Sequence, residues 1–206
     1  SRSVGAITYL FSYNFLRGNY MEELLTNILT NLGIYGPLLA SFLIILESII
    51  PILPLCVFVT MNFISFGIIL GFIISYICTI IGCNLAYFLV RLSKNYVNNK
   101  ILKDTKAQKL IKRFSKIKFT NLTLIVAIPF TPAFLINICA AISNIPYKKY
   151  LLSIIVGKIF MVYFWGFIGL TFVECLSNPY ALIKLSILLL LAYILSIITK
   201  KIMNID

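Results

Sequence analysis

The chain has 206 residues, of which 61% are hydrophobic and only 12% are charged, and its mean hydropathy is +1.01. Soluble domains are nearer half apolar and about a quarter charged, so this composition excludes an ordinary soluble protein. The net charge is +12 and histidine is absent, which excludes metal sites and acid–base chemistry built on that residue. Apolar stretches of roughly 20 residues, the length that crosses a bilayer, predict an all-α, polytopic membrane protein.

Positive charge is concentrated in one segment of the chain. Ten of the 18 lysines and arginines lie between Arg91 and Lys118, which is typical of a cytoplasmic loop facing anionic lipid headgroups rather than of a nucleic-acid surface. We expect membrane lipids as partners, with anionic headgroups at a basic loop over residues 93–119, no nucleic acid, and a homo-oligomer as an open alternative. The five cysteines show no C-x-x-C spacing, so they are expected to be small core residues, and no cofactor is expected.

Residues 1–32 are expected to form an N-terminal segment that precedes the membrane domain. From Met21, the segment MEELLTNILTNLG has leucine and isoleucine at helical spacing and predicts an amphipathic helix. Residues 4–16 are apolar but short, and Arg17 follows them rather than leading, so a cleavable signal peptide is not expected. Residues 1–20 fit either a non-native extension or a truncated further segment.

A single transmembrane domain is expected over residues 33–199, followed by a cytoplasmic tail at 200–206. Long apolar runs at 66–90, 150–173 and 181–199 predict membrane spans, and about four spanning helices are expected in all. In the basic loop, apolar and basic residues fall on opposite helical faces, which suits a helix lying in the membrane interface. An ordinary solvated connector helix fits the same pattern.

Two further apolar segments are broken by paired prolines. Between Lys118 and Lys148 the chain must leave the basic side and return to it, and the apolar residues available are too few for two spans, so we expect a re-entrant hairpin. By the same logic residues 48–65 are expected to dip from the opposite, outer face. Both segments contain P-x-x-P, 78 positions apart, which indicates an inverted repeat as in many transporters. Two proline kinks with chance similarity are the alternative. The prolines expected to form the hairpins are Pro51, Pro54, Pro129 and Pro132.

The order of motifs along the chain carries a family resemblance. Glu-x-x-x-Pro-x-x-Pro at 47–54, a span ending YFLVRL, the basic loop, IPFTPAFLINICAAIS and KKYLLSIIVGK together resemble the VTT-domain membrane proteins (SNARE-associated Golgi protein family), which are related to DedA. The resemblance covers residues 33–175 and implies two facing hairpins and movement of lipids between leaflets. The chain departs from the family pattern at Val126, in a region where many relatives have arginine, and no second membrane acid follows Glu47 before Asp104.

The candidate substrate-binding or coupling residues are Glu47, Lys158, Arg91 and Asn137. An ionised side chain at mid-bilayer costs about 2.5–3.5 kcal/mol, and Lys158 lies about 12 Å into its span. We expect Glu47 and Lys158 to approach one another, either to contact a lipid headgroup, with Lys158 replacing the missing arginine, or as a structural ion pair. Arg91 is expected to anchor its span or to touch a headgroup. Asn137 is expected to bond freed backbone carbonyls or to touch a headgroup.

The resemblance implies translocation of lipid between leaflets, either phospholipid scrambling or flipping of a polyprenyl-phosphate or similar lipid carrier. Because no P-loop motif is present, we expect this translocation to be independent of ATP. Two alternatives stay open: a proton-coupled transporter of small solutes that uses Glu47, and a non-transporting scaffold whose basic loop recruits a partner. An enzyme is not expected, since the sequence offers no nucleophile–base pair or metal cluster. The Ile-, Asn- and Lys-rich composition suggests an AT-rich genome and a bacterial plasma membrane.

Overall fold

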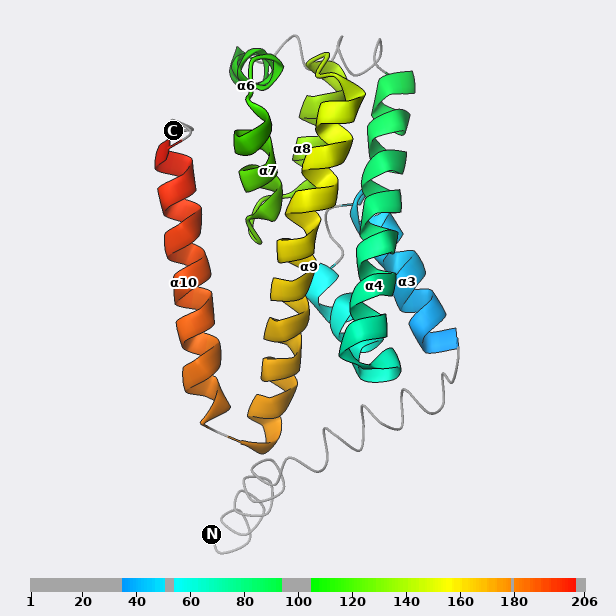
Figure 1. The fold of residues 1–206 in the computed structure, drawn as a ribbon, viewed down its shortest axis with the longest axis vertical. Helices are drawn as coiled ribbons and strands as arrows, with labels where there is room; N and C mark the ends of the chain where they lie inside the picture. The colour runs from blue at the N-terminus through cyan, green and yellow to red at the C-terminus, as the bar shows by residue number, and fades with distance from the viewer. Residues whose placement is uncertain (1–34, 51–53, 94–104, 179, 203–206) are drawn as a thin grey trace, which may run out of the picture.

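The computed structural model describes residues 35–50, 54–93, 105–178 and 180–202, and all regular structure within these ranges is helical (Figure 1). The expected N-terminal helix, Pro51 and part of the basic loop lie outside the described residues. The helices are α3 (Tyr35–Glu47), α4 (Leu55–Leu92), α6 (Thr105–Ser115), α7 (Phe119–Ala127), α8 (Ala133–Ile142), α9 (Tyr147–Ser177) and α10 (Ala181–Ile202).

The first hairpin is formed by α3 and the beginning of α4. Pro54 is extended (φ −80°, ψ 97°) and α4 starts immediately after it, because a helix cannot run through this backbone. Within α4, Gly67 has φ 77° and ψ 168°, a backbone conformation that is essentially restricted to glycine. The chain reverses there: Asn62 Nδ2 donates to Ser75 Oγ at 3.1 Å, although the two residues would be about 20 Å apart along a straight helix.

The first hairpin therefore has its described arms at 35–47 and 55–66, and it begins before the predicted range of 48–65. Its inward arm is α3 and its outward arm is the part of α4 before Gly67, and both lie in the half of the molecule away from α6 (Figure 1). The apolar run that ends at the prolines is thus an arm of the hairpin. The predicted face of insertion, opposite the basic loop, agrees with this arrangement.

The second hairpin is formed by α7 and α8, as predicted. These helices have 9 and 10 residues, or about 14 and 15 Å, half the roughly 30 Å of a bilayer core. Pro129 lies in the turn between them, and Pro132 is extended (φ −64°, ψ 118°) directly before α8. Both helices lie in the half of the molecule that contains α6 (Figure 1).

The two hairpins pack in the same register, which overturns the alternative of chance similarity. A Cβ built on Gly82 would lie 2.6 Å from the Ile45 carbonyl oxygen. A Cβ built on Gly157 would lie 2.9 Å from the carbonyl oxygen of Thr123, which is 78 positions after Ile45, the same offset as between the proline pairs. Each inward arm therefore rests on a glycine of a long helix, α3 on α4 and α7 on α9.

The long helices complete an all-α membrane architecture. Among the described residues, α4 and α9 are long and apolar enough to cross a bilayer, with mean hydropathies of 2.4 and 2.0. Helix α10 has 22 residues and packs on α9. Three long segments are thus described, and any fourth span falls outside the described residues. We call the end of the molecule that contains α6, the last turn of α4 and the first turn of α9 the basic side (Figure 1).

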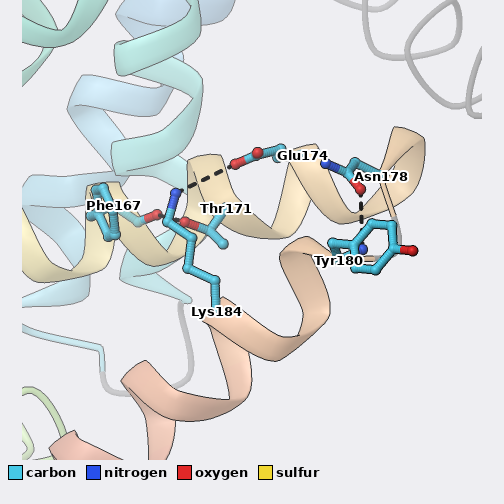
Figure 2. A network of polar contacts seen from close by, with 6 residues as sticks. All are labelled: Phe167, Thr171, Glu174, Asn178, Tyr180 and Lys184. Carbon is cyan, nitrogen blue, oxygen red and sulfur yellow. Dashed lines mark hydrogen bonds and ion pairs between the residues drawn. The ribbon is translucent and has the colours of Figure 1, made fainter.

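At the opposite end, α9 and α10 are joined by a polar turn (Figure 2). Lys184 Nζ lies 3.7 Å from Glu174 Oε2, and both side chains are about half exposed (50% and 49%). The Lys184 ammonium also lies 5.0 Å from the centre of the Phe167 ring. Exposed ion pairs of this kind stabilise a fold by about 0–1 kcal/mol, so this pair serves below as a control for the buried charges.

Candidate functional site

The tips of the two hairpins meet through a hydrogen bond. Asn137, on α8, donates from Nδ2 to the carbonyl oxygen of Ser48 at 3.2 Å, and both residues are at most 1% exposed. Ser48 directly follows the last residue of α3, where carbonyls lack helical partners. Asn137 thus bonds a freed carbonyl, as one of its two predicted roles requires, but the carbonyl belongs to the other hairpin.

Glu47 is the last residue of α3 and sits beside this contact. Its Oε2 atom is buried, and no hydrogen-bond partner lies within reach among the described residues. Leaving a buried polar atom unpaired costs about 1–3 kcal/mol, and more for a charged group. The carboxylate oxygen therefore has hydrogen-bonding capacity that no described residue uses.

Lys158 is buried on α9, with 1% of its surface exposed. Its Nζ donates to Met161 Sδ at 3.1 Å, and a thioether is a weak acceptor for an ammonium with three donors. The positive charge attracts Glu47, yet among the described residues no distance from Nζ to a Glu47 oxygen falls within 4.0 Å. The structure thus brings the two charges into one region without the ion pair that the sequence had suggested, because Lys158 is turned along its own helix toward Met161.

Val126, which stands in the region where many relatives have arginine, lies close to Lys158 in space. A Cβ on Gly157 would lie 2.6 Å from Val126 Cγ1, so Val126 packs against the residue directly before Lys158. This proximity is compatible with the expectation that Lys158 provides the cation that this chain lacks at Val126.

Arg91 is not part of this cluster. It is exposed near the end of α4 on the basic side, and its Nη1 donates to Tyr87 Oη at 2.7 Å. Arg91 lies two turns of helix beyond Cys83, or about 12 Å along α4, whereas Cys83 Sγ is 3.6 Å from Ser48 Oγ. Arg91 therefore belongs to the surface above the site.

Tyr150 is a residue of this site that the sequence analysis missed. It is fully buried, and its hydroxyl lies 2.8 Å from Asn137 Oδ1 and 2.9 Å from the Cys83 carbonyl oxygen. A pattern in the sequence could have found it, because Tyr150, Ile154, Lys158 and Met161 recur at helical spacing, and all four are buried. Their spacing places Tyr150 on the face of α9 that carries Lys158.

Comparison with known proteins agrees with this architecture. The family model of the VTT domain matches residues 50–171. An uncharacterized membrane protein of Bacillus subtilis (strain 168), YhjE, is 31% identical over 185 residues, covering 88% of this chain and 86% of YhjE. A second protein of that organism, the uncharacterized YqeD, is 26% identical over 128 residues, covering 62% of each chain. No solved structure matches. The chain belongs to the VTT-domain family of membrane proteins.

Proposed function

We propose that this protein translocates lipid between membrane leaflets without ATP, the headgroup passing the point where the hairpin tips meet. The observation that carries the proposal is the buried, unpaired Oε2 of Glu47 near a buried Lys158 whose recorded partner is a thioether. Taking an ion out of water costs several kcal/mol unless it is paired and hydrogen-bonded. Charges held in this state at membrane depth are expected where transport uses them.

The two charges suit different parts of the proposed task. Lys158 offers ammonium donors, which bind phosphate oxygens as a point charge, and every phospholipid or polyprenyl-phosphate headgroup has such oxygens. Glu47 accepts hydrogen bonds from hydroxyl or amine groups of a headgroup. While the headgroup occupies this polar region, the acyl chains stay in the bilayer, which the apolar outer surfaces of α4 and α9 contact. This role is transport rather than catalysis.

The basic side is proposed to face the cytoplasm of a bacterial plasma membrane, with several spans crossing it. Three exposed lysines lie on this side: Lys112 on α6, Lys116 in the turn directly after α6, and Lys148 at the start of α9. Cytoplasmic loops are enriched in such residues. Anionic headgroups would collect at this surface, close to where the second hairpin begins.

A leaflet-exchange assay on purified protein tests the proposal. Liposomes carry fluorescent phospholipids, and a membrane-impermeant quencher reports which of them have reached the outer leaflet. Wild type should accelerate exchange, and Glu47→Gln should slow it at least tenfold, which corresponds to about 1.4 kcal/mol on the barrier. The matched control is Glu174→Gln, which neutralises an exposed carboxylate (Figure 2) and should keep the wild-type rate.

The same preparations separate the alternatives. No exchange by well-folded wild type with phospholipid or polyprenyl-phosphate probes would contradict lipid translocation. Uptake of a water-soluble compound driven by a pH gradient, and lost in Glu47→Gln, would favour the proton-coupled transporter. A scaffold would tolerate Glu47→Gln in cells while losing function when the basic loop is neutralised.

A further inference from the structure

We propose that Tyr150 and Asn137 form a gate on the basic side of the polar centre, and that this gate keeps the tip of the first hairpin closed. The inference rests on the proposed function for its role in transport, but the opening itself can be measured without any transported lipid. The gate consists of two hydrogen bonds in series, from the Tyr150 hydroxyl to the Asn137 amide and from that amide to the Ser48 carbonyl.

The Tyr150 hydroxyl determines which way the Asn137 amide faces. Its single proton lies within reach of Asn137 Oδ1 (2.8 Å) and of the Cys83 carbonyl (2.9 Å). The Cys83 carbonyl lies inside α4, where it can also accept a backbone hydrogen bond of the helix. The hydroxyl proton is therefore assigned to Asn137 Oδ1. With Oδ1 fixed by Tyr150, Nδ2 must face Ser48. Without the hydroxyl the amide is free to flip, and a flipped amide would place Oδ1 against the Ser48 carbonyl.

The hydrogen bond to Asn137 is the weak point among the contacts of Ser48, which is itself fully buried. On one side Ser48 rests on α4, where its Oγ lies 3.6 Å from Cys83 Sγ and where the absence of a side chain at Gly82 makes room for it. On the other side Asn137 holds it through the bond of 3.2 Å. Because Ser48 follows Glu47 directly, movement of Ser48 away from Asn137 also moves the carboxylate and uncovers Cys83.

Aromatic rings cover this contact toward the basic side. The Tyr87 ring stacks on Tyr150 with centroids 4.6 Å apart and planes at 22°, and the Tyr147 ring lies 5.5 Å from Tyr87. Tyr87 is one turn beyond Cys83 on α4, and Tyr147 is one turn before Tyr150 on α9, so both rings lie between the contact and the basic surface. A headgroup that enters from the basic side therefore passes these rings before it reaches the gate.

The native thiol of Cys83 reports on opening, since Cys83 is fully buried beneath Ser48. Tyr150→Phe keeps the aromatic stack and removes the hydroxyl. In the full-length protein in liposomes, we expect N-ethylmaleimide to alkylate Cys83 about tenfold faster in this variant, the effect of losing one buried hydrogen bond. Peptide mass spectrometry distinguishes Cys83 from Cys139, which is buried in the same core on α8 and should keep its wild-type rate.

Tyr147→Phe is the matched control. It removes a hydroxyl from the same stack, but that hydroxyl is exposed and donates to Asn84 Oδ1 at 2.8 Å. Cys83 should react at the wild-type rate in this variant. Asn137→Ala breaks the gate from its other end and should reproduce the effect of Tyr150→Phe, which keeps the test valid if either variant folds poorly.

The outcomes separate the gate from the proposed function. Unchanged Cys83 alkylation in both gate variants would overturn the gate, whether or not the protein moves lipid, and equal acceleration at Cys139 would show general loosening instead. In leaflet exchange, Tyr150→Phe should be up to tenfold faster than wild type. Faster alkylation without faster exchange, in a protein whose wild type exchanges lipid, would overturn the gating role. If wild type exchanges no lipid, the proposed function fails, and the alkylation rate of Cys83 alone then tests the gate.

Discussion

Replacing Lys158 by methionine should separate a functional charge from a structural one. If Lys158 and Glu47 were a structural ion pair, breaking it would destabilise the fold by about 3–5 kcal/mol. The structure gives the opposite expectation. The burial penalty of the ammonium is several kcal/mol, while attraction across a distance above 4 Å returns less than about 4 kcal/mol at an effective dielectric constant of 20, and the recorded hydrogen bond is to a thioether.

We therefore expect Lys158→Met to have a free energy of unfolding equal to that of wild type or higher by up to about 3 kcal/mol. Glu47, left without its attracting charge, can become neutral by taking up a proton. Thermal unfolding in detergent, followed by circular dichroism, measures the stability, and leaflet exchange measures the activity, which should fall at least tenfold. Lys184→Met removes the cation of the exposed pair in Figure 2 and should change neither quantity by a measurable amount. A loss of 3 kcal/mol or more in Lys158→Met would refute the reasoning and make the pair structural.

Two further predictions concern packing and surface charge. Gly82→Ala and Gly157→Ala each place a methyl group 2.6 Å from an atom of the opposing arm, so each should lower stability by about 1–3 kcal/mol, measured as a lower melting temperature; wild-type stability in either would contradict the packing described. Neutralising exposed Lys112 on α6 together with exposed Lys116 directly after it should slow exchange in anionic liposomes by about fivefold for each lysine at low salt and very little at high salt. A loss of exchange that is independent of salt would point instead to partner recruitment or damage to the fold.

The hairpins were predictable because their signals are local. A proline removes a backbone donor wherever it stands, and lysines on both sides of a short apolar segment limit the paths that the chain can take. The extent of the first hairpin was not predictable in the same way. Its reversal at Gly67 lies next to the predicted boundary between the hairpin at 48–65 and the span at 66–90. The beginning of the hairpin was missed, because hydropathy alone does not assign the apolar run before the prolines to the hairpin.

The members of the site were predictable in part, since Arg91 lies outside it and Tyr150 was missed, and its contacts were not predictable. A glutamate and a lysine inside apolar sequence are recognisable as candidate functional residues, because a charge within a membrane segment is costly. Asn137 is recognisable as a candidate because it follows the paired prolines. Which partner each side chain meets depends on rotamers and on helix packing. Lys158 turns toward Met161 rather than Glu47, and Asn137 reaches the other hairpin, and neither result is encoded by spacing along one helix.

The repeat also bears on why the charges are there. With the offset of 78 that relates the two inward arms, the position equivalent to Glu47 is Ile125. The two glycines on which these arms rest, Gly82 and Gly157, are 75 positions apart, and by this second offset Lys158 corresponds to Cys83. Each half of the scaffold therefore packs in the same way with a charge at one of these two positions and a neutral residue at the other. Because Ile125 and Cys83 are buried in a well-packed core, the scaffold folds at these positions without a charge. The two charges are thus additions to a symmetric frame, one from each half, which packing does not require and which the proposed transport role would use.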